Sequence, residues 1–174
     1  MAPHLGKRRS SRLERVGPVT ESVRSREAIL KALATFPDEV ARVLNGRSPE
    51  ILARPGRDGG WGVVEIVPHL RDWEELYLDR ARAIVEHDRP FLPAYDDELW
   101  PIERDYRGQN PRQVFDHFRE LRARLVNYLR AVPEAAWQRI GEHEMNGAIT
   151  LQSMVNHICD HDQAHLVQMQ DALE

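Results

Sequence analysis

Apolar side chains recur at three- and four-residue spacing along four long segments of the chain. These segments cover residues 20–44, 63–86, 111–132 and the stretch from 151 onward. Such spacing places the apolar side chains on one face of a helix. Asn110 and Thr150 are typical N-terminal caps, and Asn45-Gly46 and Pro133 are typical helix ends. The pattern therefore predicts an all-α protein, a four-helix bundle around a single core.

Proline and glycine residues interrupt or separate these segments. Pro37 falls inside the first segment, so that helix is expected either to kink or to restart there. Pro68 leads to the same expectation of a kink, or of a later start, for the second helix. Residues 87–110 contain three prolines and a glycine, and they predict a long non-helical connection between the second and third long helices. Residues 141–147 are expected to form a turn-rich crossing.

The composition fits one globular domain. The chain has 174 residues, 41% hydrophobic residues and a formal net charge of −4, which is enough length and apolar content for one core. Residues 1–18 differ, because five basic side chains there face a single acidic one. We expect this stretch to be a disordered basic leader, and residues 19–174 to form a single helical bundle domain.

The residue content also excludes several classes of site and partner. Cys159 is the single cysteine, so the chain has neither a disulfide framework nor a CxxC-type zinc or redox site. No apolar run is long enough to span a membrane, and no signal peptide is recognisable. After the leader, the sequence shows no basic stripe of the kind that binds nucleic acid. We therefore expect a cytoplasmic protein with no membrane or nucleic-acid partner.

Three histidines in the fourth helix, His157, His161 and His165, stand one turn apart. The apolar stripe of that helix consists of Leu151, Met154, Val155, Ile158, Leu166 and Met169. At about 100° per residue, His165 falls near the middle of this stripe, His161 toward one edge and His157 about a quarter turn outside it. Neutral imidazoles one turn apart can bind one divalent metal ion from the same side. The alternative is that they are buried histidines that hydrogen-bond to neighbouring groups.

The second helix offers a further histidine on its apolar face. His69 lies between Ile66 and Trp73 on the helical wheel. A single buried histidine is normally structural, but this one can supply a third ligand to the pair on the fourth helix. Asp72 follows three residues later, where it can accept a hydrogen bond from the imidazole or simply be solvated.

The run from His161 to His165 has a second interpretation. It is similar to the HExxH motif, with Asp162 in the place of the glutamate. In a metallopeptidase Asp162 would be the general base. Its side chain is shorter than that of glutamate and reaches a metal-bound water less well, which weakens this interpretation.

From about Ser22 to Leu173 the chain resembles the DinB-like or YfiT-like superfamily of metal-dependent proteins. The resemblance rests on Trp61 followed by V-E-I-V-P-H-L-R-D at 64–72, and on G-A-I-T-L at 147–151 leading into H-I-C-D-H-D-Q-A-H at 157–165. Pro68, directly before the first histidine, departs from the family pattern. The resemblance implies a four-helix bundle with a long connection between helices 2 and 3. It also implies that His69, His161 and His165 hold a divalent metal ion and leave coordination positions open.

The resemblance further implies an activity, because some relatives are thiol-dependent transferases or isomerases. We expect a divalent-metal-dependent enzyme acting on a small molecule, either a low-molecular-weight-thiol S-transferase or a hydrolase using metal-bound water. Zinc or nickel suits the imidazole ligands, and iron is an alternative. Asp72, His157 and Asp162 are candidates for supporting the ligands. The alternative function is a non-catalytic, metal-binding or stress-related bundle, and in either case homodimers are common in the family.

Overall fold

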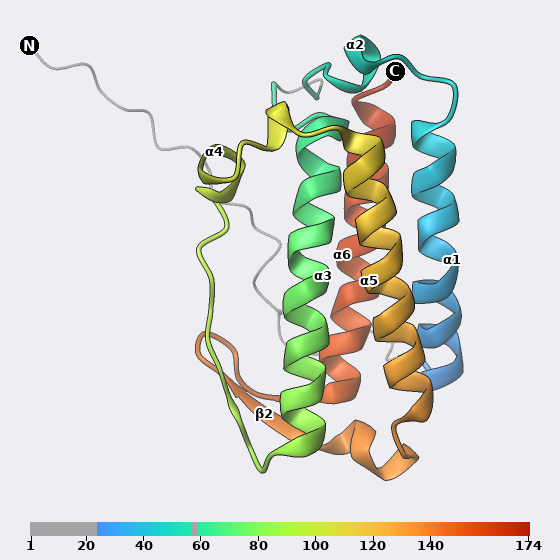
Figure 1. Cartoon of the computed structure of the whole chain (residues 1–174). Coiled ribbons are helices and arrows are strands. Elements are labelled where there is room, and N and C mark those ends of the chain that lie inside the picture. The colour runs from blue at the N-terminus through green and yellow to red at the C-terminus, as the bar shows by residue number, and fades with distance from the viewer. Residues whose placement is uncertain (1–23, 57–58) are drawn as a thin grey trace, which may run out of the picture.

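A computed structural model describes residues 24–56 and 59–174, so the predicted basic leader lies outside the described residues. Its main elements are four long helices that lie side by side along one axis (Figure 1). They are α1 (Arg26–Leu44), α3 (Val63–Glu86), α5 (Pro111–Ala131) and α6 (Leu151–Asp171). A short helix, α2 (Pro49–Leu52), follows α1. The predicted four-helix bundle is confirmed.

The helix ends follow local side-chain signals. α1 begins after Ser25, whose hydroxyl accepts a hydrogen bond from the Ala28 N–H. The start expected near Thr20 lies outside the described residues. The helix continues through Pro37, so the expected restart there is wrong. α3 likewise begins at Val63 and continues through Pro68. Its N-cap is Gly62, where a Cβ atom would stand 2.0 Å from a backbone oxygen of the preceding loop, so glycine is required.

The long connection has a topological cause. α3 and α5 run in the same direction along the bundle, so the chain must return along its outside between them (Figure 1). We call residues 87–110 the crossover. It contains a short strand β1 (Phe91–Leu92), one helical turn α4 (Trp100–Glu103) and a 3₁₀ turn η2 (Tyr106–Gly108). The crossover was predicted, but it is more structured than its prolines indicated.

A small sheet closes one end of the bundle, and the sequence did not predict it. After the 3₁₀ turn η3 (Glu134–Gln138), strands β2 (Ile140–His143) and β3 (Gly147–Thr150) form an antiparallel hairpin. β1 pairs with β2 in parallel, with Phe91 opposite Glu142. The turn-rich crossing expected at 141–147 is therefore a hairpin, whose tight turn ends at Gly147 with a φ of +69°.

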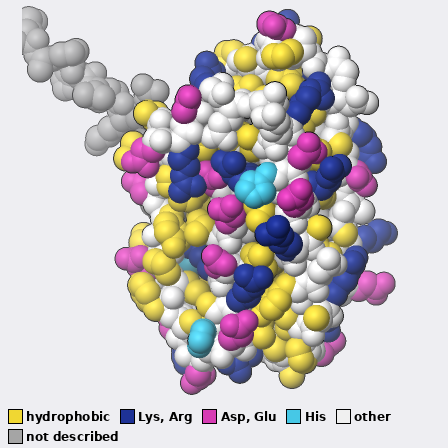
Figure 2. Space-filling model, in the orientation of Figure 1, with side chains coloured by type: hydrophobic (Ala, Val, Ile, Leu, Met, Phe, Trp, Pro, Cys, Tyr) yellow, Lys and Arg dark blue, Asp and Glu magenta, His cyan; other side chains and the backbone are white. Residues whose placement is uncertain are grey.

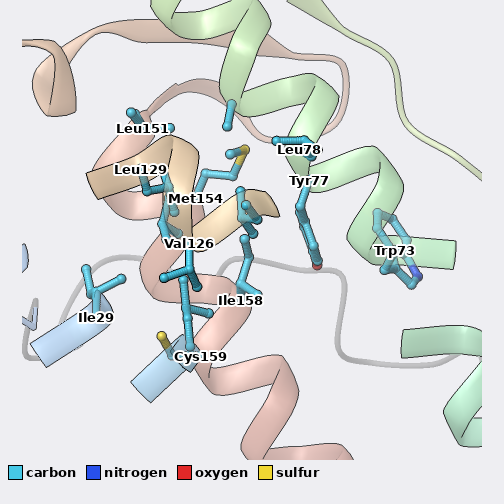
Figure 3. Close-up of a cluster of buried hydrophobic side chains, with 14 of the residues drawn as sticks. Ile29, Trp73, Tyr77, Leu78, Val126, Leu129, Leu151, Met154, Ile158 and Cys159 are labelled. Carbon is cyan, nitrogen blue, oxygen red and sulfur yellow. The ribbon is translucent and has the colours of Figure 1, made fainter. Parts of the chain in front are cut away.

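The core consists of two apolar clusters, and a layer of buried polar side chains lies between them. The cluster toward the sheet includes Tyr77, Leu129 and Ile158 (Figure 3), and the cluster toward α2 includes Val40, Val63 and Met169. Along the helices, buried polar residues separate the part that contributes to one cluster from the part that contributes to the other. Those positions are His69, Glu74, Arg122, His161, Asp162 and His165. Buried polar groups need partners, so this layer is where chemistry is expected.

The face of the molecule seen in Figure 2 carries charges of both signs and a concentration of apolar side chains. Acidic and basic side chains are interspersed on the face shown in Figure 2, and hydrophobic ones gather along its left edge, where the crossover runs. Within the part of the chain that the structure describes, four of the six exposed large hydrophobic residues belong to the crossover: Phe91, Tyr95, Leu99 and Ile102. Within the described residues, no helix is both long enough and apolar enough to cross a membrane.

Candidate metal centre

The three histidines expected to act as ligands come together in the polar layer. His69 lies on α3, and His161 and His165 lie one turn apart on α6. Their exposed fractions are 4%, 7% and 3%, whereas His157 is half-buried. The prediction that His161 and His165 face the interior, with His157 nearer the surface, is therefore confirmed. The antiparallel packing of α3 against α6 brings His69 to the other two.

The ring nitrogens of these histidines are spaced for a single ion. The Nε2 atoms of His69 and His161 are 3.2 Å apart, and one nitrogen from each of the three rings lies within 4.8 Å of the others. Two nitrogens bound to one tetrahedral zinc ion, each about 2.1 Å from it, stand about 3.4 Å apart. The donor set and its spacing fit a divalent ion.

Several ring nitrogens of these histidines have no hydrogen-bond partner among the described residues. Across residues 24–56 and 59–174, the Nδ1 atoms of His69 and His161 and the Nε2 atom of His165 have no hydrogen-bond partner. Leaving a buried polar atom unpaired is costly. An ion bound through the Nε2 atoms would satisfy Nε2 of His165, whereas the Nδ1 atoms of His69 and His161 would need other partners. On His165, Nδ1 contacts Oε1 of Gln168 at 2.9 Å. An amide oxygen can only accept, so Nδ1 carries the proton and the lone pair of Nε2 remains available.

Burial also keeps the three rings in the form that binds metals. Desolvation lowers the pKa of His69 and of His161 well below the usual value for histidine, and the neighbouring imidazoles add to this effect. Burial lowers the pKa of His165 to about 4, although its hydrogen bond to Gln168 acts in the opposite direction. The imidazoles are therefore neutral at pH 7, and a neutral imidazole is the ligand species.

Aromatic side chains surround the histidine cluster. The ring of Trp61 lies 5.0 Å from that of His69, and Trp73 lies 6.3 Å from it. Tyr77 lies 6.2 Å from the ring of His161. Trp61 follows the Gly59-Gly60 loop and is half-buried, whereas Trp73 and Tyr77 are buried on α3. These rings limit the access of water to the nitrogens.

Asp72, a predicted supporting residue, has a different set of contacts. Its Oδ2 accepts hydrogen bonds from Arg104 and from the hydroxyl of Tyr106, each at 2.7 Å, and its Oδ1 is paired with Arg71. These contacts tie α4 and η2 to α3. Asp72 thus anchors the crossover, and its predicted support of His69 remains a prediction that no described contact supports.

Asp162 is held by an ion pair inside the bundle. Arg122 of α5 donates to both carboxylate oxygens of Asp162, at 2.7 and 3.1 Å, and to both oxygens of Glu74. Burial raises the pKa of Asp162 to about 6, although Arg122 acts to lower it. Since both oxygens of Asp162 are occupied by the guanidinium, the general-base role suggested by the HExxH-like spacing is disfavoured.

The other supporting candidate, His157, lies at the edge of the cluster. Its ring centroid is 6.4 Å from that of His161, and it is half-buried. The sequence did not single out Asp97, which lies in the crossover and is buried. Its Oδ2 lies 3.6 Å from Nδ1 of His69, longer than a hydrogen bond, and accepts a hydrogen bond from Nε1 of Trp73 at 2.9 Å. Burial raises the pKa of Asp97, and the Trp73 N–H opposes this.

Comparison with known proteins gives a consistent result. The family model of the DinB superfamily matches residues 23–169. A protein of Oceanobacillus iheyensis named a "Putative metal-dependent hydrolase" is 24% identical over 144 residues, 83% of each chain. The "Putative metal-dependent hydrolase YfiT" of Bacillus subtilis is 24% identical over 138 residues, 79% of this chain and 78% of its own.

The fold is also known from a solved structure. YfiT from Bacillus subtilis, described as having an unusual four-helix bundle topology, superposes with a TM-score of 0.82. The match covers 89% of this chain and 90% of the YfiT chain. Because the two sequences are 22% identical, the match shows a shared fold and nothing more. Together with the family match over most of the sequence, these findings show that the chain belongs to the DinB superfamily.

Proposed function

We propose that this chain is a divalent-metal-dependent hydrolase whose ion is held by His69, His161 and His165. The observation that carries the proposal is the convergence of three buried, neutral imidazoles whose ring nitrogens are spaced for one ion. The names of the relatives in Oceanobacillus and Bacillus support hydrolysis as the reaction. Imidazole ligands suit zinc or nickel, and iron is an alternative.

Three protein ligands are the pattern of a catalytic rather than a structural site, because tetrahedral structural sites use four. A divalent ion with open positions lowers the pKa of water and polarises a carbonyl group. The protein contributes the shape and rigidity of the site. Gln168 fixes the tautomer of His165, and the rings of Trp61 and Trp73 keep bulk water from the imidazoles. Burial raises the pKa of Tyr77, so its hydroxyl stays protonated.

Thiol transfer is the second candidate reaction. Cys159 is the one thiol in the chain that could act as its nucleophile. This side chain is buried, and burial raises the pKa of its thiol to about 11. The thiolate is the nucleophile in such chemistry, so Cys159 is unsuited to the role. A thiol-dependent reaction would therefore use a small-molecule thiol as cosubstrate, bound at the same ion.

An activity screen with defined metal content tests the proposal. The protein would be stripped with a chelator and reloaded with zinc, nickel or iron. It would then be assayed on ester, thioester and amide substrates, and in parallel on electrophiles with a low-molecular-weight thiol. The control is the double variant His161→Ala, His165→Ala.

The outcomes separate the candidates. We expect hydrolysis by the reloaded parent and none by the stripped parent or the double variant. Thiol transfer without hydrolysis would replace the hydrolase proposal with the second candidate. A protein that binds the ion but turns over neither class of substrate would contradict both, and would favour a non-catalytic metal-binding bundle.

A further inference from the structure

One acidic side chain of the crossover points inward at the level of the histidines. Along residues 93–99 the chain runs over the outside of the bundle, and Asp96 and Glu98 are exposed. Asp97 between them is 5% exposed. A carboxylate removed from water is costly unless charged or polar groups compensate it. Its burial on an otherwise exposed segment therefore requires a partner inside.

Asp97 has two such partners, and they come from the same helix. Its Oδ2 accepts the indole N–H of Trp73 at 2.9 Å and lies 3.6 Å from Nδ1 of His69. Within the described residues, no hydrogen-bond partner is found for that Nδ1 atom. A shift of less than 1 Å would turn the 3.6 Å approach into a hydrogen bond of ordinary length, about 2.9 Å.

The crossover is anchored on both sides of Asp97. Before it, β1 pairs with β2, and the N–H of Ala94 donates to the carboxylate of Glu144 at 2.9 Å. After it, Arg104 and Tyr106 donate to Asp72 on α3. These contacts hold the segment against α3, so the position of Asp97 beside His69 follows from the fold.

We infer that Asp97 is a positioning residue for the metal site. Its carboxylate accepts a hydrogen bond from the Nδ1–H of His69. The inference rests on the proposed function, because it assigns His69 as a ligand. Once Nδ1 holds the proton, the lone pair is on Nε2, the atom that lies 3.2 Å from Nε2 of His161. Such a carboxylate fixes the ring orientation, makes the imidazole a better donor and typically changes metal affinity 10–100-fold.

Substitutions at Asp97 test this inference through Zn²⁺ affinity, measured by competition with a chelator of known affinity. Both contacts of Asp97 use Oδ2. In Asp97→Asn, an amide oxygen at that position can still accept from Trp73, but it carries no negative charge to polarise the Nδ1–H of His69. We expect a Zn²⁺ dissociation constant about 10–100 times that of the parent. Asp97→Glu keeps a charged acceptor and should recover part of the loss. Asp96→Asn, at the exposed neighbouring position, should bind Zn²⁺ like the parent.

Other measurements separate positioning from a structural role. The melting temperatures of the metal-free variants, compared with that of the metal-free parent, measure how much the loss of the Asp97–Trp73 hydrogen bond destabilises the fold when no ion is bound. In the Zn²⁺-loaded parent, nitrogen-detected NMR should show an Nδ1-bound proton on His69 that is protected from solvent exchange. This readout needs no variant and holds even if Asp97→Asn does not fold.

Two results would overturn the inference: parent-like Zn²⁺ affinity in a folded Asp97→Asn variant, or a His69 ring without a protected Nδ1 proton. A parent protein that takes up no zinc, nickel or iron would instead overturn the proposed function.

Discussion

Gln168 shows how a single side chain can determine whether a histidine is ready to bind a metal. Its amide oxygen accepts from Nδ1 of His165 and thereby leaves Nε2 unprotonated. We predict that Gln168→Leu weakens Zn²⁺ binding by about 10–100-fold, because the tautomer and ring orientation are no longer fixed. Gln170→Ala, at an exposed position on the same helix, is the control and should bind like the parent. Equal affinities for the two variants, measured by chelator competition, would contradict this role.

Arg122 is the second residue on which the polar layer depends. It is 2% exposed and neutralises two buried carboxylates at once, those of Glu74 and Asp162. Burial alone would lower the pKa of Arg122, but these carboxylates raise it, so the guanidinium stays charged. Arg122→Met should cost about 3–5 kcal/mol in the free energy of unfolding, because both carboxylates lose their counter-charge.

Urea denaturation measures that cost. The matched control is Arg124→Met, an exposed position on α5, for which the change should stay within about 0.5 kcal/mol. If the Arg122 and Arg124 variants were equally stable, the ion pairs would not hold the layer together.

Sequence periodicity predicts burial better than it predicts contacts. His161 and His165 could be placed in the interior because the helical wheel depends only on the spacing of neighbouring apolar residues. The partners of the buried polar side chains could not be predicted in the same way. Asp97 lies in an acidic run, Asp96-Asp97-Glu98, that reads as solvated, and only the path of the crossover brings it to His69. Likewise, the pairing of Asp162 with Arg122 depends on how the bundle brings the inward-facing side chains of α5 and α6 together in its interior.

At the level of elements, the start of α6 matters most, because this helix carries two of the three proposed ligands. Thr150 caps it by accepting the N–H of Ser153 at 3.0 Å, and the hydroxyl of Ser153 accepts from the N–H of Thr150. Thr150→Ala should lower the free energy of unfolding by about 1 kcal/mol. Thr150→Ser keeps the acceptor and should be close to the parent in thermal or urea unfolding. An alanine variant as stable as the serine variant would show that the cap is dispensable.

The helices were predictable and the strands were not, for a physical reason. Each long helix carries several turns of apolar periodicity, and α5 and α6 also begin at recognisable caps, Asn110 and Thr150. The strands have two to four residues, too few for an alternating pattern to stand out. The pairing of β1 with β2 depends on the return of the crossover beside Gly141, where a Cβ atom would stand 2.7 Å from the side chain of Leu92.

At the scale of the whole molecule, the proposed ion couples binding to folding. A ligand that binds only the folded state adds about 2.7 kcal/mol when its free concentration is 100 times its dissociation constant. For a chain of this length, that corresponds to a rise in melting temperature of about 5–10 °C. We predict this rise for the stripped parent on addition of zinc, and none for the His161→Ala, His165→Ala variant. The same rise in the variant would place the stabilising ion elsewhere.

The metal content of the purified protein tests the three-histidine site most directly. Tag-free parent protein, prepared without chelator, and the His161→Ala, His165→Ala variant would be compared by plasma mass spectrometry. We predict about one divalent ion per chain in the parent and none in the variant. A parent that contains no metal, and takes up none on dialysis against zinc, nickel or iron, would contradict the proposal. The histidines would then be polar residues of the core.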